Sequence, residues 1–383
     1  MNRNAQTLVP GFATPEATKA YVSRFAGSLP ESNYSDFLKT HIKLSSIGVG
    51  TFPGQPDDAT DEHYAEIVSQ ALQNGLNVID TGANYRFGRS PQAVGEGVRR
   101  AIEAGVPREA MFLISKGGFL TFPNGRPDDM ATFFRKEIMA KGLGSPEDLV
   151  QGIHLLSPGY ILWQMEQSRQ AMGVETLDAF LVDQPEVHVP EIGKQAMHGK
   201  LLKVFEVLEM AVAAGKLRSY GISTFNACRV ETDNLLFQSI TSLLGLAEKA
   251  AGGEDKKHHL KIVQMPFNVL MTEGFTRFSQ ATGQGNIAST IQAAFQLKVY
   301  LMASHSMGKG ILARESPAVF QEVMPDLANP AQQALQFNRS TPGLGTSLVG
   351  MSSPAHLQDA LAVARREPLV KDQYLKMYQR AED

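Results

Sequence analysis

Asn77-Val78-Ile79-Asp80-Thr81-Gly82-Ala83-Asn84-Tyr85 is the stretch that decides the fold. It begins with a short apolar run, typical of a buried strand, that ends in Asp80, and Tyr85 follows in a loop of small residues. A second apolar run, Met111–Lys116, ends in a lysine. The carboxyl ends of neighbouring parallel strands meet at one rim of a barrel, so we expect Asp80, Tyr85 and Lys116 to face one cavity. A lysine beside a tyrosine favours proton transfer, because the ammonium lowers the pKa of the phenol.

Short apolar runs alternate with segments of helical period along most of the chain. Tyr64–Leu72 and Leu162–Met172, for example, repeat apolar residues at helical spacing. This alternation favours parallel strands with right-handed crossovers, and eight such strands close a barrel. The predicted fold class is therefore α/β, a (β/α)8 TIM barrel with long loops and an N-terminal extension. The predicted strands are Ser46–Thr51, Asn77–Asp80, Met111–Lys116, Ala179–Asp183, Ser219–Ser223, Ile262–Pro266, Val299–Ala303 and Ser347–Gly350.

A doubly wound open sheet is the alternative fold. It would need a glycine-rich phosphate loop after its first strand, opening directly into a helix. Gly48–Gly54 contains glycines, but Pro53 interrupts the entry into a helix and the glycine spacing differs. We therefore interpret this segment as the mouth of the first barrel strand.

Two regions go beyond a minimal barrel. Residues 1–43 precede the first strand, and we predict that they form an extension packed on the barrel, with a helix near Pro15–Phe25. Residues 44–383 form the predicted barrel. Within it, residues 117–152 make a connection too long for a plain strand-to-helix loop. Loops of this length are commonly functional, so we expect this one to shape a substrate pocket.

Composition limits the classes of function. The 383 residues are 43% hydrophobic and carry a net charge of −3, which gives no basic field for nucleic acid. No apolar run is long enough to span a bilayer, and the first residues lack a signal-peptide core. The single cysteine, Cys228, excludes an internal disulfide, and the histidines show no metal-ligand spacing. We expect a cytoplasmic protein with no nucleic-acid, membrane or metal partner; its oligomeric state stays open.

Several segments, taken in order and at their intervals, resemble the aldo-keto reductases. The resemblance covers about residues 44 to 365. The segments that carry it are Ile47–Thr51, Asp80 with Tyr85, Ser90–Gly95, Lys116, Ser168–Val174, Leu177–Val182, Gly215–Ser223, Val263–Asn268 and Val349–Ser352.

The resemblance implies an oxidoreductase that uses NADP or NAD on a small carbonyl, alcohol or enone substrate. It implies that Tyr85 exchanges a proton with the substrate oxygen, that Lys116 adjusts the pKa of Tyr85, and that Asp80 orients Lys116. Ser223 and Gln264 would hold the nicotinamide carboxamide. The full set of cofactor-binding candidates is Thr51, Asp80, Ser223, Gln264, Ser304, His305, Met351, Ser352, Ser353 and His356.

Asp183 departs from the family pattern, because members usually carry a histidine there that donates a hydrogen bond to the substrate carbonyl. Two negative charges ~4 Å apart repel by about 4 kcal/mol at an effective dielectric of about 20. Three alternatives stay open. A protonated Asp183 could donate a hydrogen bond, as a glutamic acid does in members that reduce conjugated carbon–carbon double bonds. An ionised Asp183 could act as a base in alcohol oxidation, elimination or isomerisation. Finally, the barrel could have lost redox catalysis and serve as a binding module.

Three further features bear on the cofactor and on the missing imidazole. NADP-preferring members carry a lysine or arginine near Met351 and another near His356, and this chain has neither. The aromatic ring expected near Ser304 is absent unless His305 replaces it. The choice between NAD and NADP therefore stays open. We expect His188, five positions after Asp183, to lie in a surface loop.

Overall fold

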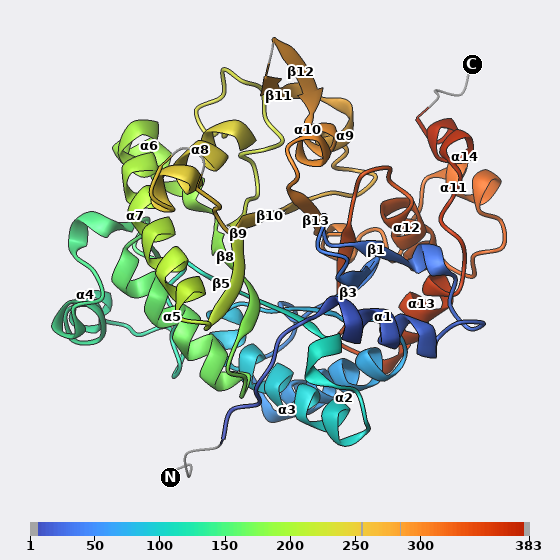
Figure 1. Ribbon diagram of the computed structural model, residues 1–383, viewed down its shortest axis with the longest axis horizontal. Coiled ribbons are helices and arrows are strands. Elements are labelled where there is room, and N and C mark those ends of the chain that lie inside the picture. The colour runs from blue at the N-terminus through green and yellow to red at the C-terminus, as the bar shows by residue number, and fades with distance from the viewer. Residues whose placement is uncertain (1–6, 254–255, 284, 379–383) are drawn as a thin grey trace.

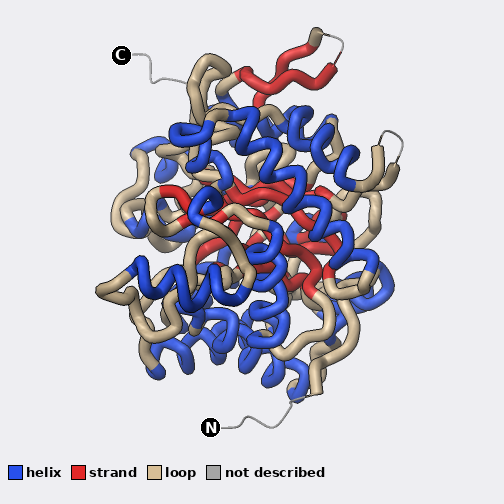
Figure 2. The backbone as a smooth tube through the Cα atoms, turned by 90° about the vertical axis from the view of Figure 1, so that its left-hand side faces the viewer, coloured by secondary structure: helices blue, strands red, loops and turns tan. Residues whose placement is uncertain are grey.

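Eight parallel strands pair in the order β10-β13-β14-β3-β4-β5-β8-β9, and the last pairs with the first to close a barrel. The computed structural model describes residues 7–253, 256–283 and 285–378. Helices surround the strands on all sides, and the second view shows the strands enclosed by them (Figures 1 and 2). The predicted (β/α)8 barrel is confirmed.

The barrel strands are β3 (Ile47–Gly50), β4 (Val78–Asp80), β5 (Phe112–Gly117), β8 (Leu177–Asp183), β9 (Leu217–Ser223), β10 (Leu260–Pro266), β13 (Tyr300–Ser304) and β14 (Thr346–Gly350). The larger helices that surround them are α2 (Asp58–Gln73), α3 (Ser90–Glu103), α5 (Pro158–Ala171), α7 (Lys194–Ala213), α8 (Ile240–Ala250), α10 (Thr290–Gln296), α12 (Pro330–Arg339) and α13 (Pro354–Ala364). The others are α1 (Pro15–Arg24), α4 (Met130–Phe133), α6 (Val189–Ile192), α9 (Glu273–Thr276), α11 (Ala318–Val323) and α14 (Lys371–Lys376).

Local sequence signals explain where these helices begin. Asp57 accepts a hydrogen bond from the main-chain nitrogen of Thr60 (2.8 Å) at the start of α2, and Ser157 caps α5 in the same way. These caps fix the first turns of α2 and α5. In the part of the chain described, no helix combines the length and apolar character needed to cross a bilayer.

The N-terminal extension closes one end of the barrel. Its hairpin, β1 (Tyr34–Asp36) with β2 (Lys43–Ser45), is antiparallel, and Phe37 and Leu44 share a buried cluster with Val78 and Phe112 from the barrel. Our proposed boundary at residue 43 falls within β2. Residues 1–6, to which the expectation about a signal peptide refers, lie outside the described residues.

A buried carboxylate ties the extension to the barrel. Asp178 Oδ1 accepts a hydrogen bond from the main chain of Ala13 (2.7 Å), while Oδ2 accepts from the main chain of Leu113 (2.8 Å). Arg108 Nη2 lies 2.8 Å from the same Oδ2, and both side chains are 2% exposed. Both oxygens of this buried carboxylate therefore accept hydrogen bonds from the protein.

The long connection after β5 builds a small core of its own. It contains α4 and the two-residue strands β6 (Leu149–Val150) and β7 (His154–Leu155). Phe122, Phe134 and Ile138 from this segment pack with Leu155 and Tyr160 in a separate buried cluster. A third hairpin, β11 (Phe278–Gly283) with β12 (Asn286–Ser289), projects from the top of the molecule (Figure 2).

Asp178→Asn should lower the free energy of unfolding by about 3–5 kcal/mol, because it leaves the Arg108 guanidinium buried without a charge partner. Urea unfolding monitored by circular dichroism measures the change. The matched control is Glu137→Gln, which breaks an ion pair with Lys141 in which both side chains are about half exposed. The control should cost less than about 1 kcal/mol. Equal losses in the two variants would contradict the anchoring role of Asp178.

Candidate active site

Polar side chains occupy the carboxyl ends of adjacent barrel strands. Asp80 ends β4, Asp183 ends β8 and Ser223 ends β9, while Lys116 is the last residue but one of β5. Gln264 lies in β10, where it pairs in register with Ser223. Parallel strands direct these ends to one rim, which is where active sites of this architecture lie.

An ion pair lies at the centre of this group. Lys116 Nζ is 2.6 Å from Asp80 Oδ2 and 3.0 Å from the carbonyl oxygen of Thr81, and the lysine side chain is fully buried. Burial by itself lowers the pKa of Lys116, but its interactions with Asp80, Tyr85 and Asp183, led by the charge of Asp80, together raise it above its ordinary value. The ammonium therefore stays charged at neutral pH.

A hydrogen-bonded chain continues from this pair toward the cofactor candidates. Gln264 Nε2 donates to Asp80 Oδ1 (3.1 Å), and Ser223 Oγ donates to Gln264 Oε1 (3.2 Å). Thr51 follows β3 and donates through Oγ1 to the carbonyl oxygen of Asp80 (3.2 Å). The structure thus brings together four of the predicted cofactor residues. One of them, Asp80, is also a predicted catalytic residue.

Tyr85 lies directly over the lysine. Lys116 Nζ is 4.8 Å from the centre of the tyrosine ring, and Phe52 meets that ring edge-on at 5.0 Å. The ring packs flat against the loop because residue 82 is glycine: a Cβ there would lie 2.7 Å from the ring. Tyr85 is half-buried and is held from three sides.

The net shift of the Tyr85 pKa is opposite to the predicted one. Desolvation is the largest influence and raises the pKa, Lys116 lowers it, and the charges of Asp183 and Asp80 raise it again. The expected lowering by Lys116 exists but is smaller than the effect of burial, so the pKa lies above its ordinary value. A phenol in this state keeps its proton at neutral pH and can act as a proton donor.

Asp183 is the second acidic group at the rim and is 6% exposed. Desolvation raises its pKa to about 6, while the charge of Lys116 lowers it and the charges of Glu186 and Asp80 raise it. The carboxyl group therefore changes its charge near neutral pH. Both its protonated and its ionised forms are chemically accessible.

The remaining cofactor candidates form two groups. Ser304 ends β13 and His305 follows it, and the His305 ring meets Phe225 edge-on at 5.1 Å. Ser353 caps α13 by accepting from the main-chain nitrogen of His356, and Ser352 donates to His356 Nδ1 (3.3 Å). No hydrogen bond among the described residues joins this second group to the Lys116 network.

Met351, another predicted cofactor-binding residue, follows β14. Its side chain is fully buried in the hydrophobic core, because it ends the apolar stretch that enters from β14. It therefore offers no surface-exposed side chain to a ligand at that position.

Sequence reasoning missed several charged residues at this rim. Glu186 is 2% exposed, and its Oε1 accepts from Thr224 Oγ1 (2.5 Å) and from the main chain of Phe225 (2.9 Å), which fixes the loop after β9. Desolvation is the main reason that the pKa of His305 is lowered. Lys309 and Arg229 lie close enough that their positive charges lower it further. The spacing of these residues in the sequence gave no sign of their convergence.

The residues present fit a dinucleotide. Ser223 and Gln264 offer hydrogen-bonding groups beside the buried Lys116 network. Lys309 supplies positive charge suited to phosphate, as does Arg229, which also pairs with Glu273 (3.2 Å). Helix α13 is eleven residues long, and its capped start adds main-chain donors of the kind that bind phosphates. In the described residues, no group of three or more His, Cys, Asp or Glu is arranged to hold a metal ion.

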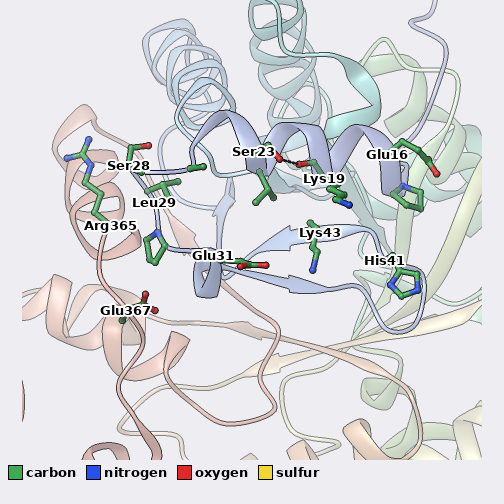
Figure 3. Close-up of a pocket in the computed structure, with 15 residues that line it drawn as sticks. Glu16, Lys19, Ser23, Ser28, Leu29, Glu31, His41, Lys43, Arg365 and Glu367 are labelled. Atoms are coloured by element: carbon green, nitrogen blue, oxygen red, sulfur yellow. Dashed lines mark hydrogen bonds between the residues drawn. The ribbon is translucent and has the colours of Figure 1, made fainter.

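One hollow of the molecule lies away from the polar cluster. A groove of about 1080 Å³ runs between α1, the β1–β2 hairpin and the segment of Arg365 and Glu367 (Figure 3). It belongs to the N-terminal end of the barrel, and none of the predicted site residues lines it. Cavity size by itself would therefore point away from the polar cluster.

Asp183→Asn should remove a pH dependence of stability. The folded protein holds the Asp183 proton up to about pH 6, whereas the ordinary carboxyl value is 3.8. Between these values the folded state binds more protons, so stability falls as pH rises. The wild type should lose about 2–3 kcal/mol relative to the variant between about pH 4 and about pH 7. Urea unfolding of both proteins across this pH range measures the predicted difference. The same pH dependence of the unfolding free energy in wild type and variant would contradict the raised pKa of Asp183.

Comparison with known proteins gives a family. The family model described as "Aldo/keto reductase family" matches residues 46–381. Aldo-keto reductase YhdN of Bacillus subtilis (strain 168) is 26% identical over 202 residues, which are 52% of this chain and 49% of that protein. The NADH-specific methylglyoxal reductase of Escherichia coli (strain K12) is 24% identical over 193 residues, 49% of this chain and 51% of that protein. The chain thus matches about half the length of these curated relatives.

Two solved structures share the fold. The holo form of aldo-keto reductase AKR11C1 from Bacillus halodurans has a TM-score of 0.61 at 16% identity and covers 91% of this chain and 97% of its own. An aldo/keto reductase from Klebsiella pneumoniae in complex with NADP and acetate has a TM-score of 0.59 at 17% identity, with coverage of 90% and 95%. Together with the family match over most of its length, the closed barrel and the polar rim, this means that the chain belongs to the aldo/keto reductase family.

Proposed function

We propose that this protein is an NAD(P)H-dependent oxidoreductase that interconverts a carbonyl compound, or an enone, and its reduced form, with Tyr85 as the general acid or base. The observation that carries the proposal is the buried Lys116–Asp80 pair (2.6 Å) beneath the ring of Tyr85. The Klebsiella relative is described with NADP and the Escherichia coli relative as NADH-specific, which supports a nicotinamide cofactor of either kind.

Different residues would bind different parts of the dinucleotide. We assign the carboxamide to Ser223 and Gln264, and the phosphates to Lys309, Arg229 and the start of α13. Thr51, Ser304, His305 and His356 complete the proposed set at the rim. A bound nicotinamide would supply the hydride for reduction or accept it for oxidation.

The proton that reduction requires would come from a side chain of the protein. In reduction, the Tyr85 hydroxyl donates its proton to the substrate oxygen as negative charge develops there. The Lys116 ammonium then stabilises the phenolate that remains, because it is already charged and its position is fixed by Asp80. The same groups act in reverse when an alcohol is oxidised.

Asp183 decides how the substrate oxygen is received. A protonated carboxyl can donate a hydrogen bond to that oxygen, whereas an ionised one repels it by about 4 kcal/mol at ~4 Å and a dielectric of about 20. Because its pKa is about 6, the protonated form is available at mildly acidic pH. We therefore propose that reduction is supported by the protonated form.

A second candidate function follows from the same pKa. At neutral pH most Asp183 side chains are ionised and can accept a proton, which suits a lyase or isomerase on the same barrel. Such a reaction forms product without net change in the cofactor absorbance.

Tyr85→Phe should lower kcat at least about 100-fold, because it removes the proton donor and keeps the ring. The assay follows NADH and NADPH absorbance with a panel of aldehydes, ketones, enones and alcohols. The matched control is Tyr34→Phe in the extension, whose hydroxyl donates to the carbonyl oxygen of Gly75 (3.0 Å). That control should keep wild-type turnover, and fluorescence of the reduced nucleotide checks binding in both variants. Unchanged turnover in Tyr85→Phe would remove this residue from the mechanism.

Asp183→Asn separates the two candidate functions. For the wild type, kcat/KM for carbonyl or enone reduction should fall as pH rises through about 6, since the protonated form is lost. The amide cannot ionise and still donates a hydrogen bond, so the variant should retain reduction and show no such fall. Loss of all product formation in the variant, with no cofactor oxidation by the wild type, would favour Asp183 as a base.

A further inference from the structure

The peptide group between Asp183 and Gln184 is held at both of its ends. Its carbonyl oxygen lies 2.6 Å from His154 Nε2, and its N–H donates to the carbonyl oxygen of Ser223, also at 2.6 Å. Gln184 has φ +48° and ψ +52°, in the left-handed region that non-glycine residues adopt at a cost of roughly 1–2 kcal/mol. Two short hydrogen bonds thus maintain a strained turn next to the carboxyl group of the rim.

The direction of these bonds sets the proton positions on two histidines. A carbonyl oxygen only accepts, so His154 Nε2 carries a proton, and in the neutral ring Nδ1 is then an acceptor. His188 Nε2 lies 2.9 Å from His154 Nδ1 and therefore donates to it. His188 Nδ1 is left as a bare nitrogen with no hydrogen-bond partner in the described part of the chain. Desolvation lowers the pKa of His154 to about 3 and that of His188 to about 4, consistent with two neutral rings.

The position of His188 corrects a prediction. We expected a surface loop, but His188 is fully buried, as is His154. The turn Pro185–His188 folds inward because the left-handed Gln184 redirects the chain at the end of β8. The two rings then meet edge-on with centres 4.9 Å apart.

His154 comes from the long connection after β5, not from the barrel. That connection returns to the rim through main-chain bonds from Leu155 to Gly118 (2.8 Å) and from Leu120 to Ile153 (2.7 Å). Gly118 makes room for the imidazole, since a Cβ there would lie 2.6 Å from His154 Nε2. Phe119 covers the ring edge-on at 4.7 Å. The inserted segment therefore reaches the main chain of Asp183 through a single side chain.

We propose that His154, with its tautomer set by His188, is a positioning residue that clamps the Asp183–Gln184 peptide and so keeps the Asp183 carboxyl directed at Tyr85 and Lys116. The proposal rests on the proposed function, in which Asp183 receives the substrate oxygen. It gives the inserted segment 117–152 and the strand β7 a defined task at the site. A displacement of ~1 Å at a reacting group can lower a rate about 100-fold.

The central test compares His154→Leu with His154→Gln. Leucine removes the donor, whereas the glutamine Nε2 can replace the imidazole Nε2–H. His154→Leu should lower kcat about 10- to 100-fold with little change in cofactor affinity, and His154→Gln should recover most of it. The matched control is His259→Leu, which removes a hydrogen bond to Glu209 (2.6 Å) at the opposite end of β10. Thermal unfolding of all variants monitors stability, and a purely structural role would make kcat follow stability with no rescue by glutamine.

A double-mutant cycle tests the part played by His188. His188→Leu should lower kcat less than His154→Leu, because His154 keeps its donor in one of its two tautomers. In a His154→Leu background the second change should have no further effect on kcat. Additive losses would show that His188 does not act through His154.

A readout without turnover separates this proposal from the proposed function. The 13C signal of the Asp183 carboxyl, assigned by its absence from Asp183→Asn, should titrate near pH 6 in the wild type. In His154→Leu the midpoint should fall by at least about one unit as the carboxyl leaves its buried position, and glutamine should restore it. An unchanged midpoint with unchanged kcat overturns the clamp. A shifted midpoint in a protein whose Tyr85→Phe variant retains full turnover overturns the proposed function and leaves the clamp supported.

Discussion

The rim of this barrel is organised around one buried positive charge. A fully buried ammonium is tolerated only with close partners, since removing it from water costs several kcal/mol. Lys116 has such partners in Asp80, at 2.6 Å, and in the carbonyl oxygen of Thr81, while Tyr85 lies over it. The aligned ends of β4 and β5 hold Asp80 and Lys116 in place, so the barrel itself determines the geometry of this ion pair beside Tyr85.

The second carboxyl group changes the charge of the site. Lys116 balances Asp80, and an ionised Asp183 adds a net negative charge to a nearly water-free rim. Desolvation is the main reason that the pKa of Asp183 rises to about 6; the charge of Lys116 lowers this pKa, and the charges of Glu186 and Asp80 raise it. In the proposed function, the protonation state of Asp183 therefore governs whether the rim donates a hydrogen bond to an electron-rich substrate oxygen or repels it.

The two ends of the barrel differ in the side chains that occupy them. At the N-terminal end, the extension seals the barrel with apolar side chains and with the fully bonded Asp178. At the other end, charged groups and left-handed turns remain, and the inserted segment contributes His154 from outside the barrel. The unpaired buried polar atoms at this end include His188 Nδ1 and Glu186 Oε2, and the backbone of Gln184 is in the left-handed region.

The sequence by itself determined the barrel and placed a group of polar residues together at its rim. Alternating apolar runs and helical segments are local patterns, and polar residues at strand ends follow directly from parallel pairing, so Asp80, Lys116, Ser223 and Gln264 could be placed together in advance. Only the tertiary structure decided the net direction of the Tyr85 pKa, the burial of Met351 and His188, and the contact of His154 with Asp183. Desolvation and hydrogen bonding between residues 29 or more positions apart depend on how the chain packs, and no local pattern in the sequence records them.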